Sequence, residues 1–314
     1  MVLHADDYGL SPAVSAGIRE GFERGLLTST SILSNAPDAA RALGAWQRLA
    51  EARRGGGLPS SARRRRLDDP DRDFDLGVHL NLTQGRPLAG DGFPAELLDS
   101  EGRLPGIARL ARRLWLGGGR FAAALEDELR RQIEFVLDHG RQPAHLSGHQ
   151  YVELLPVVGR IVASLAVRFR IPAVRVAAET AWLRSLGWPG VEPRRWLLRG
   201  VQRLMARPFR RRMAAAGVTA PDAFLGSVSA GRVNLEQVRL FLAAQRKFRS
   251  AEIVLHPGQF PASDPAAGDG WSDAWADRRP NELRLVLCEE LADLFERSGV
   301  RLGRMAQWAG YASA

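Results

Sequence analysis

Two adjacent carboxylates and four histidines are the side chains of this sequence that could perform chemistry together. They stand beside the ends of segments with the pattern of strands: Asp6, Asp7, His79, His145, His149 and His256. Two imidazoles and one carboxylate are a familiar facial ligand set for a divalent cation, and they leave positions open for water and substrate. A second carboxylate and a further histidine would supply a base and an acid for metal-assisted hydrolysis.

Each of these segments also has a plainer interpretation. The Asp-Asp-Tyr-Gly run at residues 6–9 can be a solvated turn before a helix that Ser11 caps. His79 can stand on the exposed side of a half-buried strand. Polar groups at several strand ends are harder to explain by chance than any one of them, so we interpret the set as one site. Neighbouring side chains on an extended segment point to different sides, so one aspartate is expected to bind a metal while the other faces substrate or water.

Alternating strands and helices would position this set. Strands are predicted at the start of the chain, at 28–35, 75–83, 144–150, around Val174, at 252–258 and near Val300. Helices are predicted over 12–25, from Asp38 through Leu49, over 120–139, after Pro156, over 233–248 and over 282–297. The alternation indicates an α/β fold that is (β/α)-barrel-like, a distorted TIM-type barrel of parallel strands with outer helices.

Length and composition indicate one large domain. We expect a single domain over residues 1–314, with loop insertions about 53–73, 84–118 and 185–230, the second irregular throughout. Hydrophobic residues make up 45% of the chain, which suffices for a substantial core, and no segment has the ~18 consecutive apolar residues of a membrane span. Asp6 and Asp7 interrupt the start before a signal peptide could form.

Net charge and cysteine content indicate which binding partners and which cellular compartment to expect. The net charge of +9 comes almost wholly from arginine, and no nucleic-acid-binding signature accompanies it, so nucleic acid is not expected as a partner. The single cysteine, Cys288, excludes an internal disulfide and indicates a reducing, cytoplasmic location. It lies among leucines in a predicted helix, so we interpret it as a structural thiol and not a nucleophile.

Five fragments in a fixed order resemble the YdjC-like carbohydrate deacetylase family: HADDYGLSPAV, TSTSILSN, GVHLNLT, HLSGHQ and LHPG. They span residues 4–258, and RRPNEL near residue 279 also fits, so the resemblance covers nearly the whole chain. One branch of the family removes acetyl groups from chito-oligosaccharides, and another, called HpnK, is associated with hopanoid lipid biosynthesis. The GHQ and GRPL segments and the arginine-rich helices are more similar to the hopanoid branch.

The resemblance implies metal-dependent hydrolysis of the N-acetyl amide of an amino sugar. On the matching positions, Asp7, His79 and His149 would be the metal ligands. Asp6 would be the base that activates the attacking water, and His256 the acid that protonates the leaving amine. The family implies magnesium, whereas two imidazoles and one carboxylate suit zinc or another transition metal at least as well.

Three departures from the family pattern bear on this interpretation. His4 stands where the family often has Asn, and Tyr151 and Glu153 stand where a His-Gln-His-x-His run commonly continues. A changed neighbour of a ligand can lower metal affinity or activity. A catalytically degenerate relative that binds a sugar or lipid therefore remains an alternative, as does a different metal hydrolase such as a phosphoesterase. The expected substrate is an N-acetylglucosaminyl hopanoid lipid, with soluble chito-oligosaccharides as the alternative; a homodimer is left open.

A basic segment at 194–212 bears on the choice of substrate. Arg195, Arg199 and Arg203 recur every four residues beside an apolar row of Leu197, Val201, Leu204 and Met205. One interpretation is a solvated helix packed on the barrel and interrupted by Pro208. The other is an interfacial helix that rests on anionic lipid at the inner face of the membrane and brings the site to a membrane glycolipid.

Overall fold

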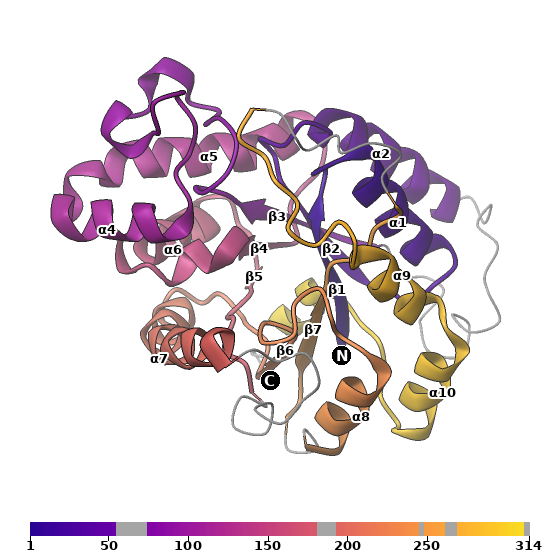
Figure 1. The fold of residues 1–314 in the computed structure, drawn as a ribbon. Helices are drawn as coiled ribbons and strands as arrows, with labels where there is room; N and C mark the ends of the chain where they lie inside the picture. Colours follow the sequence, from indigo (N-terminus) through magenta and orange to yellow (C-terminus); the bar gives the residue numbers. More distant parts are fainter. Residues whose placement is uncertain (55–73, 181–192, 245–247, 261–268, 311–314) are drawn as a thin grey trace.

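The central element of the protein is a curled sheet of parallel strands (Figure 1). The computed structural model describes residues 1–54, 74–180, 193–244, 248–260 and 269–310. The strands in these ranges are β1 (Val2–Tyr8), β2 (Ser29–Ile32), β3 (Asp75–Leu80), β4 (His145–Gly148), β5 (Ala173–Val174), β6 (Ala223–Leu225) and β7 (Ala251–Leu255). Their order in the sheet is β5-β4-β3-β2-β1-β7-β6. The predicted α/β, barrel-like fold is confirmed.

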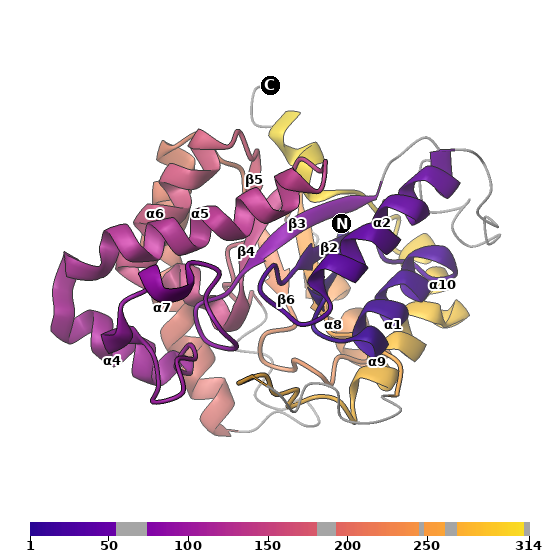
Figure 2. The same cartoon turned by 90° about the horizontal axis from the view of Figure 1, so that it is seen from above.

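Helices surround this sheet (Figures 1 and 2). They are α1 (Pro12–Glu23), α2 (Ala39–Arg54), α4 (Ile107–Gly117), α5 (Ala122–Asp138), α6 (Pro156–Arg168), α7 (Pro193–Ala215), α8 (Leu235–Ala244), α9 (Arg279–Leu287) and α10 (Glu289–Arg297). The strand residues are buried throughout, as expected where helices cover a parallel sheet. Because every strand pair is parallel, the carboxyl ends of the strands share one edge of the sheet.

The two ends of the sheet approach each other through single bridges. Ala173 of β5 pairs with Thr219, and Glu179 pairs with Phe224 of β6. Backbone bonds accompany both bridges, including one of 2.8 Å from the Val174 amide to the Thr219 carbonyl. The barrel is thus closed by bridges instead of a continuous ladder, which is the distortion of the TIM-type arrangement.

The first helix follows its sequence signals and holds the loop after β7 in place. Ser11 caps α1 by accepting a hydrogen bond of 3.3 Å from the Val14 amide. A Cβ atom at Gly17 would lie 2.6 Å from the Cα atom of Gly258. Only glycine therefore lets α1 pack this closely against the residues that follow His256.

Two elements were not predicted, because they lie in segments expected to be irregular insertions. The first is α4, where Leu110 and Leu114 are buried at helical spacing between arginines. The second is β6, a three-residue strand beside β7. The expected insertion at 53–73 lies outside the described residues except for its first two positions, as does the part of 185–230 up to residue 192.

The C-terminal region differs from expectation at two points. The helix expected over 282–297 is two helices, because Cys288 between them has an extended backbone with φ −78° and ψ 149°. Cys288 is therefore half-buried at a helix start and not within a helix core. The expected strand near Val300 does not form: residues 300–304 have no regular secondary structure, although Met1 donates to the Arg301 carbonyl and accepts from the Gly303 amide.

Pro208 does not interrupt the basic segment. α7 continues from Pro193 to Ala215 with the proline inside it. Ala206, Phe209 and Met213 are buried on either side of Pro208, so packing holds the helix through a position that lacks a backbone donor. No helix among the described residues has both the length and the apolar character that a membrane crossing requires.

Two arginines of α7, Arg199 and Arg203, face inward. The Arg199 guanidinium lies over the Tyr151 ring at 4.7 Å, and Arg203 donates to the Glu179 carbonyl at 2.8 Å. Both therefore point toward the barrel, while the side chain of Arg195 lies outside the described residues. The helix therefore packs on the barrel through Arg199 and Arg203, which contact Tyr151 and the Glu179 carbonyl.

Candidate active site

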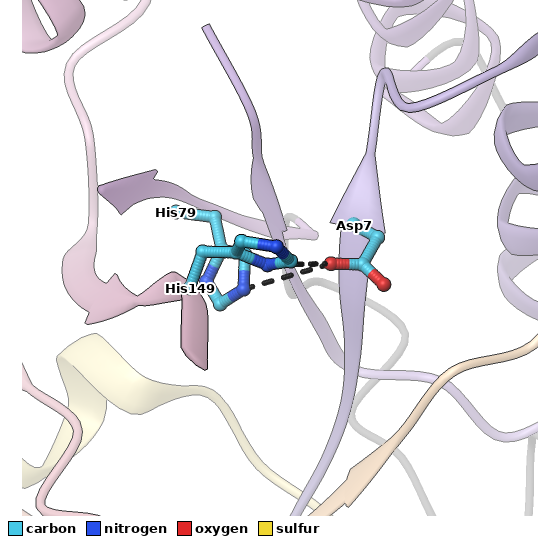
Figure 3. A group of neighbouring side chains, drawn as sticks. All are labelled: Asp7, His79 and His149. Carbon is cyan, nitrogen blue, oxygen red and sulfur yellow. Dashed lines mark ion pairs between the residues drawn. The ribbon is translucent and has the colours of Figure 1, made fainter. Parts of the chain in front are cut away.

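Asp7, His79 and His149 lie together at the carboxyl edge of the sheet (Figure 3). Asp7 is in β1, His79 is in β3, and His149 follows β4 directly. Asp7 Oδ1 lies 3.3 Å from His149 Nδ1 and 3.7 Å from His79 Nε2. One ligand atom from each residue can be chosen so that all lie within 4.8 Å of one another. Parallel strands with shared ends thus bring together residues that are far apart in the sequence.

An irregularity in β1 directs both aspartates to this edge. The register between β1 and β2 shifts between Ala5 and Tyr8, and Asp7 has a left-handed φ of 69°. A bulge of this kind re-aims side chains that would otherwise alternate. Asp6 Oδ2 and Asp7 Oδ1 each lie 3.7 Å from His79 Nε2. The two carboxylates therefore share one site, although regular strand geometry predicts different sides for them.

The second oxygen of Asp7 is bound by an arginine from α9. Arg279 Nη2 lies 2.7 Å from Asp7 Oδ2, and Arg279 Nε donates to Asp273 at 2.6 Å. Burial by itself would raise the pKa of Asp7, but Arg279 together with the neighbouring His149 and His256 holds that pKa far below its usual range. Asp7 is therefore ionised, with Oδ2 paired and Oδ1 directed at the two imidazoles.

Asp6 is held by a second buried arginine. Arg175, directly after β5, lies with Nη1 2.7 Å from Asp6 Oδ2 and Nη2 2.7 Å from Glu252 Oε1. His4 Nε2 lies 3.2 Å from Asp6 Oδ1. Burial would raise the pKa of Asp6, but Arg175 holds it well below its usual range. Asp6 is thus a carboxylate at neutral pH and available as a proton acceptor.

His79 is kept neutral and oriented by its surroundings. Burial lowers the pKa of His79 to about 3, so the ring does not carry the proton that would prevent metal binding. Its Nδ1 lies 2.8 Å from Ser147 Oγ, which donates in turn to Ser31 Oγ at 2.9 Å. This contact orients the ring so that Nε2 faces Asp6 and Asp7. Histidines that bind metals are commonly oriented in this way, by a hydrogen bond at the other ring nitrogen.

His256 lies beside both Asp6 and Arg279, whose Nη1 donates to the His256 carbonyl at 3.4 Å. It follows β7 directly, and its Nε2 lies 3.8 Å from Asp6 Oδ2. The Glu282 carboxylate accepts from the His256 amide at 2.5 Å and lies 3.8 Å from its Nδ1. Trp275 packs edge-on against the imidazole at 4.2 Å between centroids. Backbone and ring contacts together fix this histidine beside the carboxylates.

His145 is not part of the cluster. Its Nδ1 lies 3.3 Å from Asp75 Oδ1, and its ring packs edge-on against His4 at 4.9 Å. A Cβ atom at Gly77 would lie 2.3 Å from His145 Nε2, so the ring occupies the space beside β3. His145 therefore packs deeper in the barrel, because it begins β4 while His149 follows its end.

The two unusual residues after His149 pack around the site. Tyr151 is nearly buried beneath Arg199 and has a left-handed φ of 63°. Glu153 is buried, with neither carboxylate oxygen bonded among the described residues, and burial raises its pKa to about 8. Its carboxyl occupies the space beside Gly148, where a Cβ atom would meet it. Glu153 is thus a protonated acid at neutral pH.

The donor set fits one divalent cation. Asp7 Oδ1 and His149 Nε2 are buried and have no hydrogen-bond partner among the described residues. Buried polar atoms without partners are costly, and coordination would satisfy them. Two imidazoles and one carboxylate suit a transition metal such as zinc, whereas magnesium prefers an all-oxygen set.

Sequence inspection missed the groups that hold the site residues in place. Arg175, Arg279 and Glu282 each contact a predicted site residue directly. The arginines carried no signal in a chain with 44 basic residues. A better signal was position, because Arg175 directly follows a predicted strand, as the site histidines do.

Comparisons with known proteins show which family and fold the chain resembles. The family model described as YdjC-like protein matches residues 1–297. A carbohydrate deacetylase of Mus musculus is 31% identical over 96% of this chain and 92% of its own length, and a chitooligosaccharide deacetylase of Serratia marcescens is 28% identical over 59% and 62%. A crystal structure from Enterococcus faecalis, described as a cellobiose-phosphate cleavage protein, has a TM-score of 0.71 at 19% identity, covering 98% of this chain and 97% of that one. This last likeness concerns the fold alone.

Proposed function

The chain belongs to the YdjC-like protein family, and on that premise we propose that it is a hydrolase that removes the N-acetyl group of an amino sugar. The relatives named as carbohydrate or chitooligosaccharide deacetylases support this activity. The observation that carries the proposal is the buried cluster of Asp7, His79 and His149 with Asp6 and His256 beside it. It combines a cation site with a proton acceptor and a proton donor, which amide hydrolysis requires.

Asp7, His79 and His149 would hold one divalent cation. When bound, the cation would polarise the acetyl carbonyl and lower the pKa of the attacking water. Asp7 supplies the one negative charge of the set, and Arg279 fixes which of its oxygens faces the imidazoles. His79 and His149 would supply nitrogen donors.

Asp6 and His256 divide the proton transfers. Asp6 accepts a proton as water adds to the amide carbon. Arg175 makes Asp6 a weak base, so the attacking water must itself be acidified before Asp6 can take its proton. His256 gives a proton to the amine nitrogen as the C–N bond breaks, releasing acetate and the free amino sugar. The distance of 3.8 Å between His256 Nε2 and Asp6 Oδ2 supports this division, because both side chains could reach the same amide group.

We propose two substrates in order of preference. The GHQ and GRPL segments favour an N-acetylglucosaminyl hopanoid lipid. The names of the bacterial chitooligosaccharide deacetylases favour a soluble chito-oligosaccharide. Both present the same N-acetylglucosamine group to the site, so the chemistry above holds for either.

The test is acetate release by the purified protein. The protein is supplied with zinc or magnesium, and the substrates are an N-acetylglucosaminyl hopanoid in detergent and diacetylchitobiose. We expect acetate from at least one substrate, and none from His149→Ala assayed in parallel. Binding of either substrate without acetate release under any metal would instead make the chain a sugar- or lipid-binding relative.

A further inference from the structure

The outward side of α7 is apolar. Leu197, Leu198, Val201 and Leu204 are between 50% and 64% exposed and lie over two turns of the helix. Scattered exposed apolar side chains are ordinary, but a contiguous set marks a contact surface. The inward side is occupied by Arg199 and Arg203, which leaves this apolar row without a partner among the described residues.

Helix α4 also carries exposed apolar side chains. Trp115 is 82% exposed and Leu116 is 68% exposed, the former being the most exposed large apolar side chain described. Both views show α4 and α7 on the flank of the barrel that also holds α5 and α6 (Figures 1 and 2). The two helices therefore lie on one side of the molecule, and each carries exposed apolar side chains. We name Trp115, Leu116, Leu197, Leu198, Val201 and Leu204 the apolar flank.

The two helices that carry the apolar flank also carry positive charge. Neither 107–117 nor 193–215 contains an acidic residue. Arg109 and Arg112 are exposed on α4, and Arg194, Arg207 and Arg211 are exposed on α7. Helices that lie in the membrane interface typically combine exposed tryptophan and leucine with exposed arginine, as α4 and α7 do together.

We propose that the apolar flank is a membrane-docking surface whose partner is an anionic lipid bilayer. The leucines and Trp115 enter the boundary between headgroups and acyl chains, and the arginines meet lipid phosphates. A second copy of the chain is a poorer partner, because the same arginines would face each other across the contact. The proposal does not depend on the deacetylase activity, since it rests on the surface alone.

The experiment is co-sedimentation of the full chain with vesicles. Vesicles of phosphatidylcholine are compared with vesicles containing phosphatidylglycerol, at low and high salt. The double variant Leu197→Ser/Leu204→Ser tests the apolar row. Leu240→Ser/Phe248→Ser is the matched control, because these residues are 42% and 40% exposed and lie outside α4 and α7.

We expect the wild type to sediment with anionic vesicles and to be released by salt. The α7 double variant should bind at least about tenfold more weakly, since two half-exposed leucines lose their lipid contact. The control should bind as the wild type does. Absence of wild-type binding at low salt, or equal binding by both double variants, overturns the proposal. Self-association that the α7 variant abolishes, without vesicle binding, would assign the surface to a second copy.

Discussion

Arg279 binds one oxygen of Asp7 and leaves the other facing His79 and His149. The 2.7 Å contact to Oδ2 and the 3.3 Å approach of Oδ1 to His149 define a carboxylate with a fixed direction. Arg279 comes from a helix 272 residues farther along the chain. The candidate metal centre is therefore assembled by tertiary contacts from opposite ends of the sequence.

Loss of this orientation should weaken metal binding. Arg279→Lys keeps the charge but cannot contact Asp7 and Asp273 in the same fixed geometry. We expect the affinity for zinc to fall by about 10–100-fold, as for other groups that orient a ligand. Titration of the metal-free protein by calorimetry measures this. Arg278→Lys, one residue away, is the control, and an affinity equal in both variants would remove Arg279 from the site.

Replacement of Asp6 should separate catalysis from metal binding. Asp6→Asn keeps the size of the side chain and removes the proton acceptor. Turnover should fall by about 10²–10⁴-fold, the usual contribution of a general base, while metal content stays at the wild-type level. Acetate release and elemental analysis of one preparation measure both. Loss of metal in Asp6→Asn together with retention in Asp7→Asn would mean that the two roles are reversed.

The buried Arg175 should matter for stability as well as for the site. Arg175→Leu leaves Asp6 and Glu252 as buried carboxylates without their cation. Breaking a buried ion pair from one side typically lowers the free energy of unfolding by about 3–5 kcal/mol. Arg239→Leu, the control, removes an exposed ion pair with Glu236 and should change the free energy of unfolding by less than about 1 kcal/mol. Denaturant unfolding of the three proteins gives these values, and similar stabilities would contradict the network.

Glu153 should make stability depend on pH. Its folded pKa of about 8 lies above the ordinary value of 4.5, so folding opposes its ionisation. The stability contribution of Glu153 is complete below pH 4.5 and is lost as the pH rises toward 8, by on the order of 1.4 kcal/mol per unit. The free energy of unfolding of Glu153→Gln should therefore rise relative to that of the wild type as the pH increases from 4.5 to 8. Above pH 8 the two free energies should change in parallel. Measurement is by denaturant unfolding of both proteins at several pH values. If their free energies of unfolding change in parallel from pH 5 to 8, folding does not oppose the ionisation of Glu153.

The sequence predicted the site residues because they follow strands. His79, His149 and His256 stand at the carboxyl ends of β3, β4 and β7, and the alternating pattern was enough to place them on one edge. The choice of His149 over His145 came from the family resemblance, because periodicity does not fix where β4 ends. The structure places only His149 at the cluster.

Long-range contacts explain what sequence inspection could not find. Arg175 and Arg279 are two of many arginines, and only the folded chain shows that they pair with Asp6 and Asp7. The bulge at Asp6 and Asp7 is equally invisible, since an extended segment predicts alternation. The direction of α7 depends on which side finds a partner in the barrel, and Tyr151 supplies that partner for Arg199.

The most direct test of the account is the metal content of the purified protein. Elemental analysis after exhaustive dialysis should give one divalent ion per chain for the wild type. His149→Ala should lose it with the fold retained by circular dichroism. His145→Gln should keep it, because His145 packs against Asp75 and His4 away from the cluster. Full occupancy in His149→Ala, or loss in folded His145→Gln alone, would contradict a centre built from Asp7, His79 and His149.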